Sequence, residues 1–290
     1  MNTSVRLEAK ALLSGHTAKL FFISFFSFLL RYATLSLLAV SVALYYKSAL
    51  FSFFIKQYGN VTTYSVSTFI FLLTAFGLLL FISAIKSGER FAYLIRANGG
   101  SGGFRLLFKF MHPKNSLRCL VLYTKIHLLQ GMWNIYFFLP TAICVLCIYY
   151  IKNIVFTIDF AFLILLAGAT ITFSAAVVMS KTNSLRYSAA PHYLFLNKAL
   201  SSEEAIEKSL YFTDGFLLNG TVLDFSFTGW LLSCIFIIPA FYVVPFIKLA
   251  KTIYITEALL SPIMSKTEYP VNILGLSTHG QKQLSDHPNM

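Results

Sequence analysis

The chain has 290 residues, of which 57% are hydrophobic, 17% aromatic and only 12% charged, and its mean hydropathy is +0.71. Soluble domains carry about 25% charged and about 45–50% apolar residues, so this composition excludes an ordinary soluble protein, a disordered chain, a collagen and a disulfide scaffold. The net charge of +12 raises nucleic-acid binding as a function, but no basic stripe coincides with a motif that reads nucleic acid. We therefore expect no nucleic-acid partner and predict an all-α polytopic transmembrane helix bundle.

The apolar residues fall in five long blocks. A helix needs about 20 residues to cross roughly 30 Å of hydrocarbon, so each of the first four blocks predicts one pass. The last block, 216–260, is too long for one pass and contains Pro239 and Pro245, which favours two short passes with a turn near Pro239. About six spans are expected, with five as the alternative, in a single domain over 1–264, and a polar, disordered tail over 265–290. The predicted spans are 20–46, 61–85, 120–151, 154–180, 217–238 and 240–260.

The distribution of Lys and Arg predicts the orientation, because basic residues are retained on the cytoplasmic side of a membrane. The segments 1–19, 86–125 and 181–216 together carry fifteen Lys and Arg, against three on the opposite side. We therefore expect the N-terminus and both long connections in the cytoplasm, with the basic connection 86–125 able to attract anionic lipid headgroups. Lys248 and Lys251 lie inside the predicted last pass and must reach the interface or line polar space.

Two short cytoplasmic helices are expected in the connections. Residues 104–111 combine apolar residues with Arg105 and Lys109 at i,i+4, which predicts a short basic helix on the membrane surface. In the second connection, Ser201 and Glu204 form a capping-box pattern, in which each side chain satisfies a free backbone N–H at a helix start.

Several stretches resemble one known family. They are 5–15, the segment from Trp133 to Pro140, the Tyr-rich stretch 187–194, and 204–209 followed by 224–230 and Pro245. The chain resembles a divergent member of the bacterial integral membrane family catalogued as domain of unknown function 975. It departs from that family at Asn197-Lys198-Ala199, where the family usually has Asp-Asn-Pro. The resemblance implies a multi-pass protein of the bacterial cytoplasmic membrane and carries no activity.

Ionisable residues inside a membrane are costly, by about 2.5–3.5 kcal/mol on insertion scales, so each one is a candidate functional residue. Arg31 lies inside the first block. It is either an intramembrane functional group or a marker of the interface, with the first pass beginning near Tyr32. Asp224 with Thr228 at i+4 is the second candidate. Its alternative is an acid at the start of pass five, where the helix dipole favours a negative charge.

A polar stripe runs along the third block, formed by Tyr123, His127, Gln130 and Asn134. Steps of four, three and four residues place these side chains on one helical face, and unsatisfied polar groups disfavour a lipid-facing position. The stripe is therefore expected to face the bundle, either as a polar path or as interhelical hydrogen bonds that fix the packing.

No catalytic or metal-binding set is found. Cys144 and Cys147 form a Cys-x-x-Cys pattern, but they lie in an apolar helix and Cys119 and Cys234 do not supply a second ligand pair at the right spacing. No glycine-rich phosphate loop or nucleophile elbow occurs. We predict no enzyme, no cofactor and no metal.

The sequence favours a non-enzymatic accessory or scaffolding component of the membrane, in contact with the lipid bilayer and with a membrane-protein partner. The alternative is a small transporter or channel that uses kinked helices around Pro140, Pro239 and Pro245. Convergence of Arg31, His127 and Asp224 on one cavity near the midplane would favour transport. A dry bundle with these groups at the interfaces would favour the accessory role.

Overall fold

The computed structural model describes residues 2–47, 61–101, 103–154, 160–197, 199–213, 215–234 and 237–264, and every element within these ranges is a helix. The all-α prediction is confirmed for this part of the chain, while the predicted tail 265–290 lies outside the described residues. The elements are α1 (Asn2–Leu13), α2 (Thr17–Lys47), α4 (Val61–Ala97), η1 (Phe104–Phe108), α5 (Pro113–Ile154), α6 (Phe160–Arg186), α7 (Ala190–Leu196), α8 (Ser202–Thr213), α9 (Leu217–Ser226), α10 (Thr228–Ser233) and α11 (Ile237–Met264).

Four stretches within the described ranges are long and apolar enough to cross a membrane: Thr17–Ala43, Thr68–Ala97, Pro113–Tyr150 and Phe162–Leu196. They correspond to the first four predicted spans, so a membrane protein with four candidate membrane-spanning helices is confirmed. The helices extend well beyond the predicted spans on the basic side. α4 continues to Ala97 and α5 begins at Pro113.

The last apolar block folds differently from the prediction. It forms α9, α10 and α11 instead of two helices that meet at Pro239. The turn predicted near Pro239 is wrong because this proline lies in the first turn of α11, where the missing N–H would have no intrahelical partner anyway. α9 and α10 have 10 and 6 residues, about 15 and 9 Å of helix, so neither crosses a bilayer by itself.

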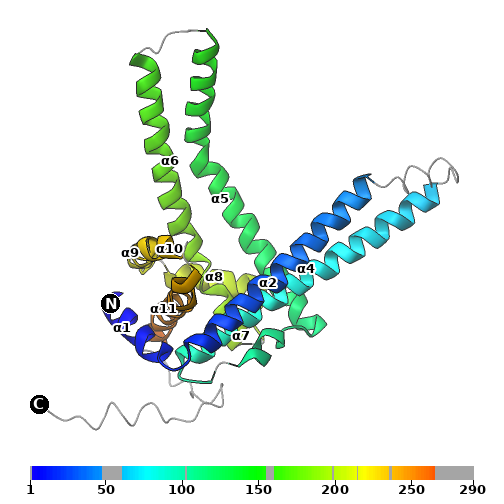
Figure 1. Cartoon of the computed structure of the whole chain (residues 1–290), viewed down its shortest axis with the longest axis vertical. Helices are drawn as coiled ribbons and strands as arrows, with labels where there is room; N and C mark the ends of the chain where they lie inside the picture. The colour runs from blue at the N-terminus through cyan, green and yellow to red at the C-terminus, as the bar shows by residue number, and fades with distance from the viewer. Residues whose placement is uncertain are drawn as a thin grey trace, which may run out of the picture.

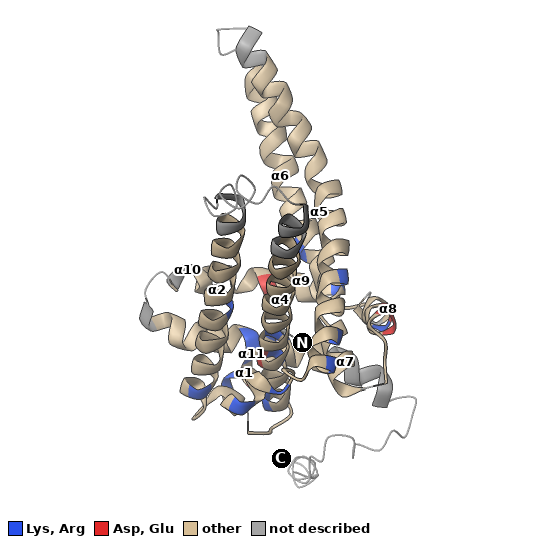
Figure 2. Ribbon diagram, turned by 90° about the vertical axis from the view of Figure 1, so that its right-hand side faces the viewer, with Lys and Arg blue, Asp and Glu red and all other residues tan. Residues whose placement is uncertain are grey.

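The long helices form two arms that diverge from a common base (Figure 1). One arm is α2 packed against α4, and the other is α5 packed against α6. α1 and α11 pack together at the base, where α11 also contacts α2 and α4. Figure 2 shows Lys and Arg gathered around this base.

The base has a continuous hydrophobic core. Val5, Ala9 and Leu13 recur every four residues on α1 and are fully buried, which makes α1 an amphipathic helix docked by one face. They pack in one cluster with buried residues of α11 such as Leu249 and Ile253. The N-terminal segment is thus an integral part of the fold.

The basic surface helix predicted over 104–111 is shorter than expected. The structure has only the 3₁₀ helix η1, and its Leu107 is fully buried against α4. η1 approaches α4 so closely that a Cβ atom at Gly88 would lie 2.2 Å from the Leu107 carbonyl oxygen. Docking onto α4 therefore determines the conformation of this segment more than its own helical periodicity does.

The predicted capping box at α8 is confirmed. The Ser201 backbone N–H donates to Glu204 Oε2 at 2.9 Å, and the Glu204 N–H donates to Ser201 Oγ at 3.2 Å. Glu203, the residue before Glu204, is exposed, and a hydrogen bond from Lys125 of α5 lowers the pKa of its carboxyl. These contacts fix where α8 begins and link it to α5.

Replacing Ser201 with Ala is expected to lower the free energy of unfolding by about 1 kcal/mol, because one N–H at the start of α8 loses its acceptor. The midpoint of thermal unfolding in detergent measures the effect. Ser36→Ala is the matched control, since Ser36 is exposed within α2 and bonds only to the Tyr32 carbonyl one turn earlier. Equal midpoints for the two variants would contradict a stabilising cap.

Candidate functional site

The site begins with a polar stripe on α2. Steps of four, three and four residues place Leu20, Ser24, Ser27 and Arg31 on one helical face. Leu20 contributes its backbone carbonyl to this stripe, and the other three contribute polar side chains. This face packs against α4, on which Glu89 and Tyr93 are also one turn apart. The two helices therefore bring polar groups together inside an otherwise apolar arm.

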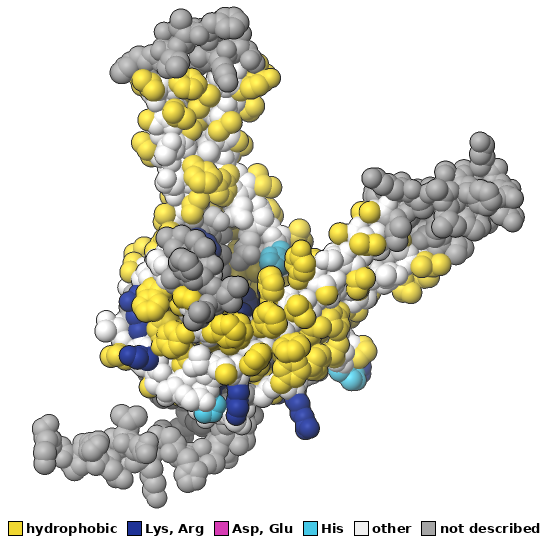
Figure 3. Space-filling model, in the orientation of Figure 1, with side chains coloured by type: hydrophobic (Ala, Val, Ile, Leu, Met, Phe, Trp, Pro, Cys, Tyr) yellow, Lys and Arg dark blue, Asp and Glu magenta, His cyan; other side chains and the backbone are white. Residues whose placement is uncertain are grey.

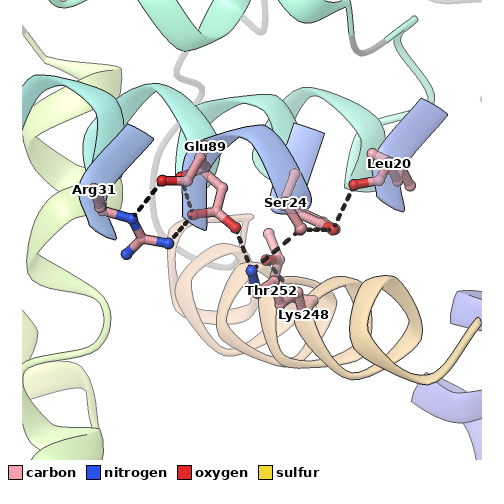
Figure 4. A network of polar contacts seen from close by, with 8 residues as sticks. Leu20, Ser24, Arg31, Glu89, Lys248 and Thr252 are labelled. Carbon is pink, nitrogen blue, oxygen red and sulfur yellow. Dashed lines mark hydrogen bonds and ion pairs between the residues drawn. The ribbon is translucent and has the colours of Figure 1, made fainter. Parts of the chain in front are cut away.

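Glu89 is the centre of a buried network between α2, α4 and α11 (Figure 4). Its side chain is only 7% exposed and forms ion pairs with Arg31, at 2.9 Å, and with Lys248. Ser27 donates a third hydrogen bond to the carboxylate at 2.6 Å. A buried charge is tolerated only when it is paired and hydrogen-bonded, and Glu89 meets both conditions.

A second branch of the network starts from Lys248. Its ammonium donates to Ser24 Oγ at 3.1 Å, Ser24 contacts the Tyr93 hydroxyl at 2.7 Å, and Tyr93 donates to the Leu20 carbonyl at 3.2 Å. Both branches connect α11 to the first arm. The sequence left two alternatives for Lys248, the membrane interface or polar space, and the side chain lines a polar cavity.

Asp224 forms the second ion pair of the site, with Lys251 of α11 at 2.8 Å. The interpretation of Asp224 as an acid at a helix start is wrong, because α9 begins at Leu217 and places Asp224 in its last turn. The dipole disfavours a negative charge there. The compensating charge comes from Lys251 instead.

The predicted stripe on α5 divides into two parts. Tyr123, His127 and Gln130 line one cavity at the base, and Lys86 of α4 donates to His127 Nε2 at 3.2 Å. Asn134 lies further along α5 and accepts a hydrogen bond from Ser180 of α6 at 2.6 Å. Asn134 therefore serves the packing of the α5–α6 arm.

The cavity has a volume of about 410 Å³ and lies between the bases of the two arms. Figure 3 shows Lys and Arg side chains recessed there. Within the described residues it is lined by two carboxylates, Glu89 and Asp224, and by six cationic side chains. These are Arg31, Lys86, Arg90, Lys181, Lys248 and Lys251. The site is strongly basic and also has apolar walls, such as Ile126 and Ile255.

Four of the five residues singled out from the sequence meet at this cavity: Arg31, His127, Gln130 and Asp224. Arg31 lies in the middle of the continuous helix α2, with its guanidinium directed at Glu89. The sequence reasoning missed Glu89, because it was counted within a basic connection. The available signal was the spacing of Ser24, Ser27 and Arg31 on one face of α2, together with Glu89 and Tyr93 one turn apart on α4.

The chemistry of the cavity is that of anion binding. Its cations offer N–H donors, and Tyr123 adds a hydroxyl group. No group of three or more His, Cys, Asp or Glu side chains able to hold a metal ion occurs in the part of the chain that the structure describes. The four cysteines, including Cys144 and Cys147, carry free thiols.

The chain matches no known protein family, no curated protein and no solved structure. Its fold and its cavity therefore define its class by themselves. Over the residues that the structure describes, it is an all-helical membrane protein in which four candidate membrane-spanning helices form two arms around a basic cavity.

Proposed function

We propose that the protein is a non-enzymatic accessory component of the bacterial cytoplasmic membrane that binds an anionic molecule in the basic cavity. The observation that carries this proposal is the excess of cationic over anionic side chains in one partly enclosed space. Charges held close together in a region of low dielectric repel one another strongly. An anion that enters the cavity relieves this repulsion, and the gain is its binding energy.

The proposed orientation places the cavity near the cytoplasmic surface, with the N-terminus in the cytoplasm. Beyond the cavity, residues 131–154 of α5 and 160–180 of α6 continue as helix. At 1.5 Å per residue these segments are about 36 and 32 Å long, enough to cross the hydrocarbon region alone. The concentration of Lys and Arg at the base (Figure 2) supports a cytoplasmic position for that end.

The finer parts of the assignment are proposals of the same kind. The family resemblance supports a bacterial source. Four spans, fewer than the five or about six expected from the sequence, return the C-terminus to the cytoplasm. In this arrangement η1 and α8 are cytoplasmic, and the exposed apolar faces of the arms contact lipid or a membrane-protein partner. Crosslinking in native membranes, followed by mass spectrometry, tests whether one such partner exists.

The proposal predicts that an anionic molecule co-purifies with the protein. The full-length protein, extracted in mild detergent, is denatured, and the released small molecules are compared by negative-ion mass spectrometry. Lys86→Gln with Arg90→Gln removes two cavity charges that take part in no ion pair among the described side chains. We expect the amount of bound anion per folded protein to fall by about tenfold or more, since a charge-assisted hydrogen bond contributes about 1.5–3 kcal/mol.

The matched control is Lys19→Gln with Lys114→Gln, which changes the net charge equally at exposed positions that do not line the cavity. This control variant should retain the anion. Equal amounts of anion in both double variants, or none in the wild type, would overturn the proposal.

Transport is the second candidate. Arg31, His127 and Asp224 do line one cavity, but the proposed orientation places that cavity near the cytoplasmic surface and not at the midplane, where convergence would favour transport. Transport requires that the cavity also open to the opposite side of the membrane. Reconstituted protein should then move the co-purified anion across vesicles, and Asp224→Asn should change that flux. If the protein binds the anion but produces no flux, transport is excluded and the accessory role is supported.

A further inference from the structure

The cations of the cavity fall into two groups. Arg31 and Lys248 are paired with Glu89, and Lys251 is paired with Asp224. All three side chains are therefore held in ion pairs, and the two carboxylates offset two of their three positive charges.

The second group consists of Lys86 and Arg90 of α4 and Lys181 of α6, for which no ion pair exists among the described residues. Lys86 and Arg90 are one helical turn apart and both contact the Tyr123 ring, at 4.3 and 5.4 Å from its centroid. Like charges at i,i+4 destabilise a helix. The ring holds two cations side by side without neutralising either of them.

Buried polar groups without partners line the same cavity. The Tyr123 hydroxyl and both ring nitrogens of His192 have no partner at normal hydrogen-bond distance in the described part of the chain, although Ser87 lies near Tyr123 and the Ser188 backbone near His192. Tyr123 is 5% exposed and His192 is 3% exposed. An unsatisfied buried polar group costs about 1–3 kcal/mol, and a native protein rarely leaves one without a reason. These groups point to a ligand independently of the charges.

We infer that Lys86, Arg90, Lys181, Tyr123 and His192 bind a phosphate group, an assignment that rests on the proposed anion-binding function. The five side chains come from four elements, α4, α5, α6 and α7, and three of them are cations. The matching ligand carries more than one negative charge and several acceptor oxygens. A phosphate monoester has a charge of about −1.5 to −2 and three acceptor oxygens, whereas a carboxylate has one charge and two oxygens.

The phosphate has two sources, the headgroup of a lipid or a soluble phosphate compound. The test uses full-length protein in detergent and three probes: dihexanoyl phosphatidic acid, inorganic phosphate, and decanoate as an anionic amphiphile without phosphorus. The unfolding midpoint is followed against the concentration of each probe to give a dissociation constant. We expect both phosphate probes to bind more tightly than decanoate. Tighter binding of the lipid identifies a headgroup site, whereas equal binding of the two identifies a site for soluble phosphate.

Two variants locate the binding site. Arg90→Gln is expected to weaken phosphate binding by about tenfold or more, and Lys19→Gln, outside the cavity, should leave it unchanged. Tyr123→Phe separates binding from folding, because the hydroxyl has no partner at normal hydrogen-bond distance among the described residues. This variant should unfold no more easily than the wild type without probe, yet it should bind phosphate several-fold more weakly.

Failure of this inference and failure of the proposed function give different results. Decanoate that binds as tightly as the phosphate probes, with binding lost in Arg90→Gln, would overturn the phosphate assignment and keep the anion site. Absence of binding by all three probes would overturn both. Unchanged phosphate affinity in Tyr123→Phe would remove Tyr123 from the site.

Discussion

Replacing Glu89 with Gln is expected to lower the free energy of unfolding by about 2–3 kcal/mol. Removing one partner of a buried ion pair usually costs about 3–5 kcal/mol, because the other charge stays buried without compensation. The smaller value applies here because the side chains of Arg31 and Lys248 are 26% and 37% exposed and retain part of their hydration. The midpoint of thermal unfolding in detergent measures the change.

Two further variants test whether the charges of the Glu89 network cause this loss. Asp224→Asn breaks the more exposed single pair with Lys251 and should cost about 1 kcal/mol or less. Combining Glu89→Gln with Arg31→Met and Lys248→Met removes all three charges and should recover most of the stability, since no buried charge is left unpaired. A triple variant less stable than Glu89→Gln would show that packing, and not charge, makes Glu89 important.

Replacing Gly88 with Ala is expected to destabilise the protein by about 3 kcal/mol. The added Cβ would lie 2.2 Å from the Leu107 carbonyl oxygen and 2.6 Å from its carbonyl carbon. Both are backbone atoms, so no side-chain rotation relieves the clash, and η1 must move away from α4. Overpacking of this kind costs about 1–3 kcal/mol and occasionally more. Loss of the η1 contact should also make the buried Leu107 accessible to proteolysis or hydrogen exchange.

Gly77→Ala is the matched control on the same helix. A Cβ at Gly77 meets no atom within 4 Å, and Ala is a better helix former than Gly by about 1 kcal/mol. This variant should be as stable as the wild type or more stable. If the two glycine variants unfold at the same midpoint, η1 does not pack against α4 as described.

The features that were predictable from the sequence are those encoded locally. Four apolar blocks gave four candidate membrane-spanning helices, because the length of an apolar helix depends only on neighbouring residues. The capping box of Ser201 and Glu204 was also correct, since its partners are three residues apart. The spacing of Tyr123, His127 and Gln130 correctly placed them on one face toward other helices.

The features that were not predictable depend on partners far apart in the sequence. Glu89 pairs with Arg31 and Lys248, which are 58 and 159 residues away. The spacing of polar residues on each helix marks a polar face but does not identify which partner that face meets. Asp224 was given the wrong helix end because the predicted span 217–238 begins where α9 does but continues too far, whereas α9 already ends at Ser226. Pro239 was taken as a break because its position within the first turn of α11 depends on where that helix begins.

The divergence of the two arms leaves apolar faces uncovered. Phe69 and Leu73 on α4, and Ile135 and Leu146 on α5, are all more than half exposed, so no other helix of the described chain covers them. We propose that, in a bilayer, acyl chains fill the wedge between the arms, as side chains fill the interior of a closed bundle. The length and saturation of those chains then influence how far the arms open. The angle between the arms becomes a joint property of the sequence and of the membrane around it.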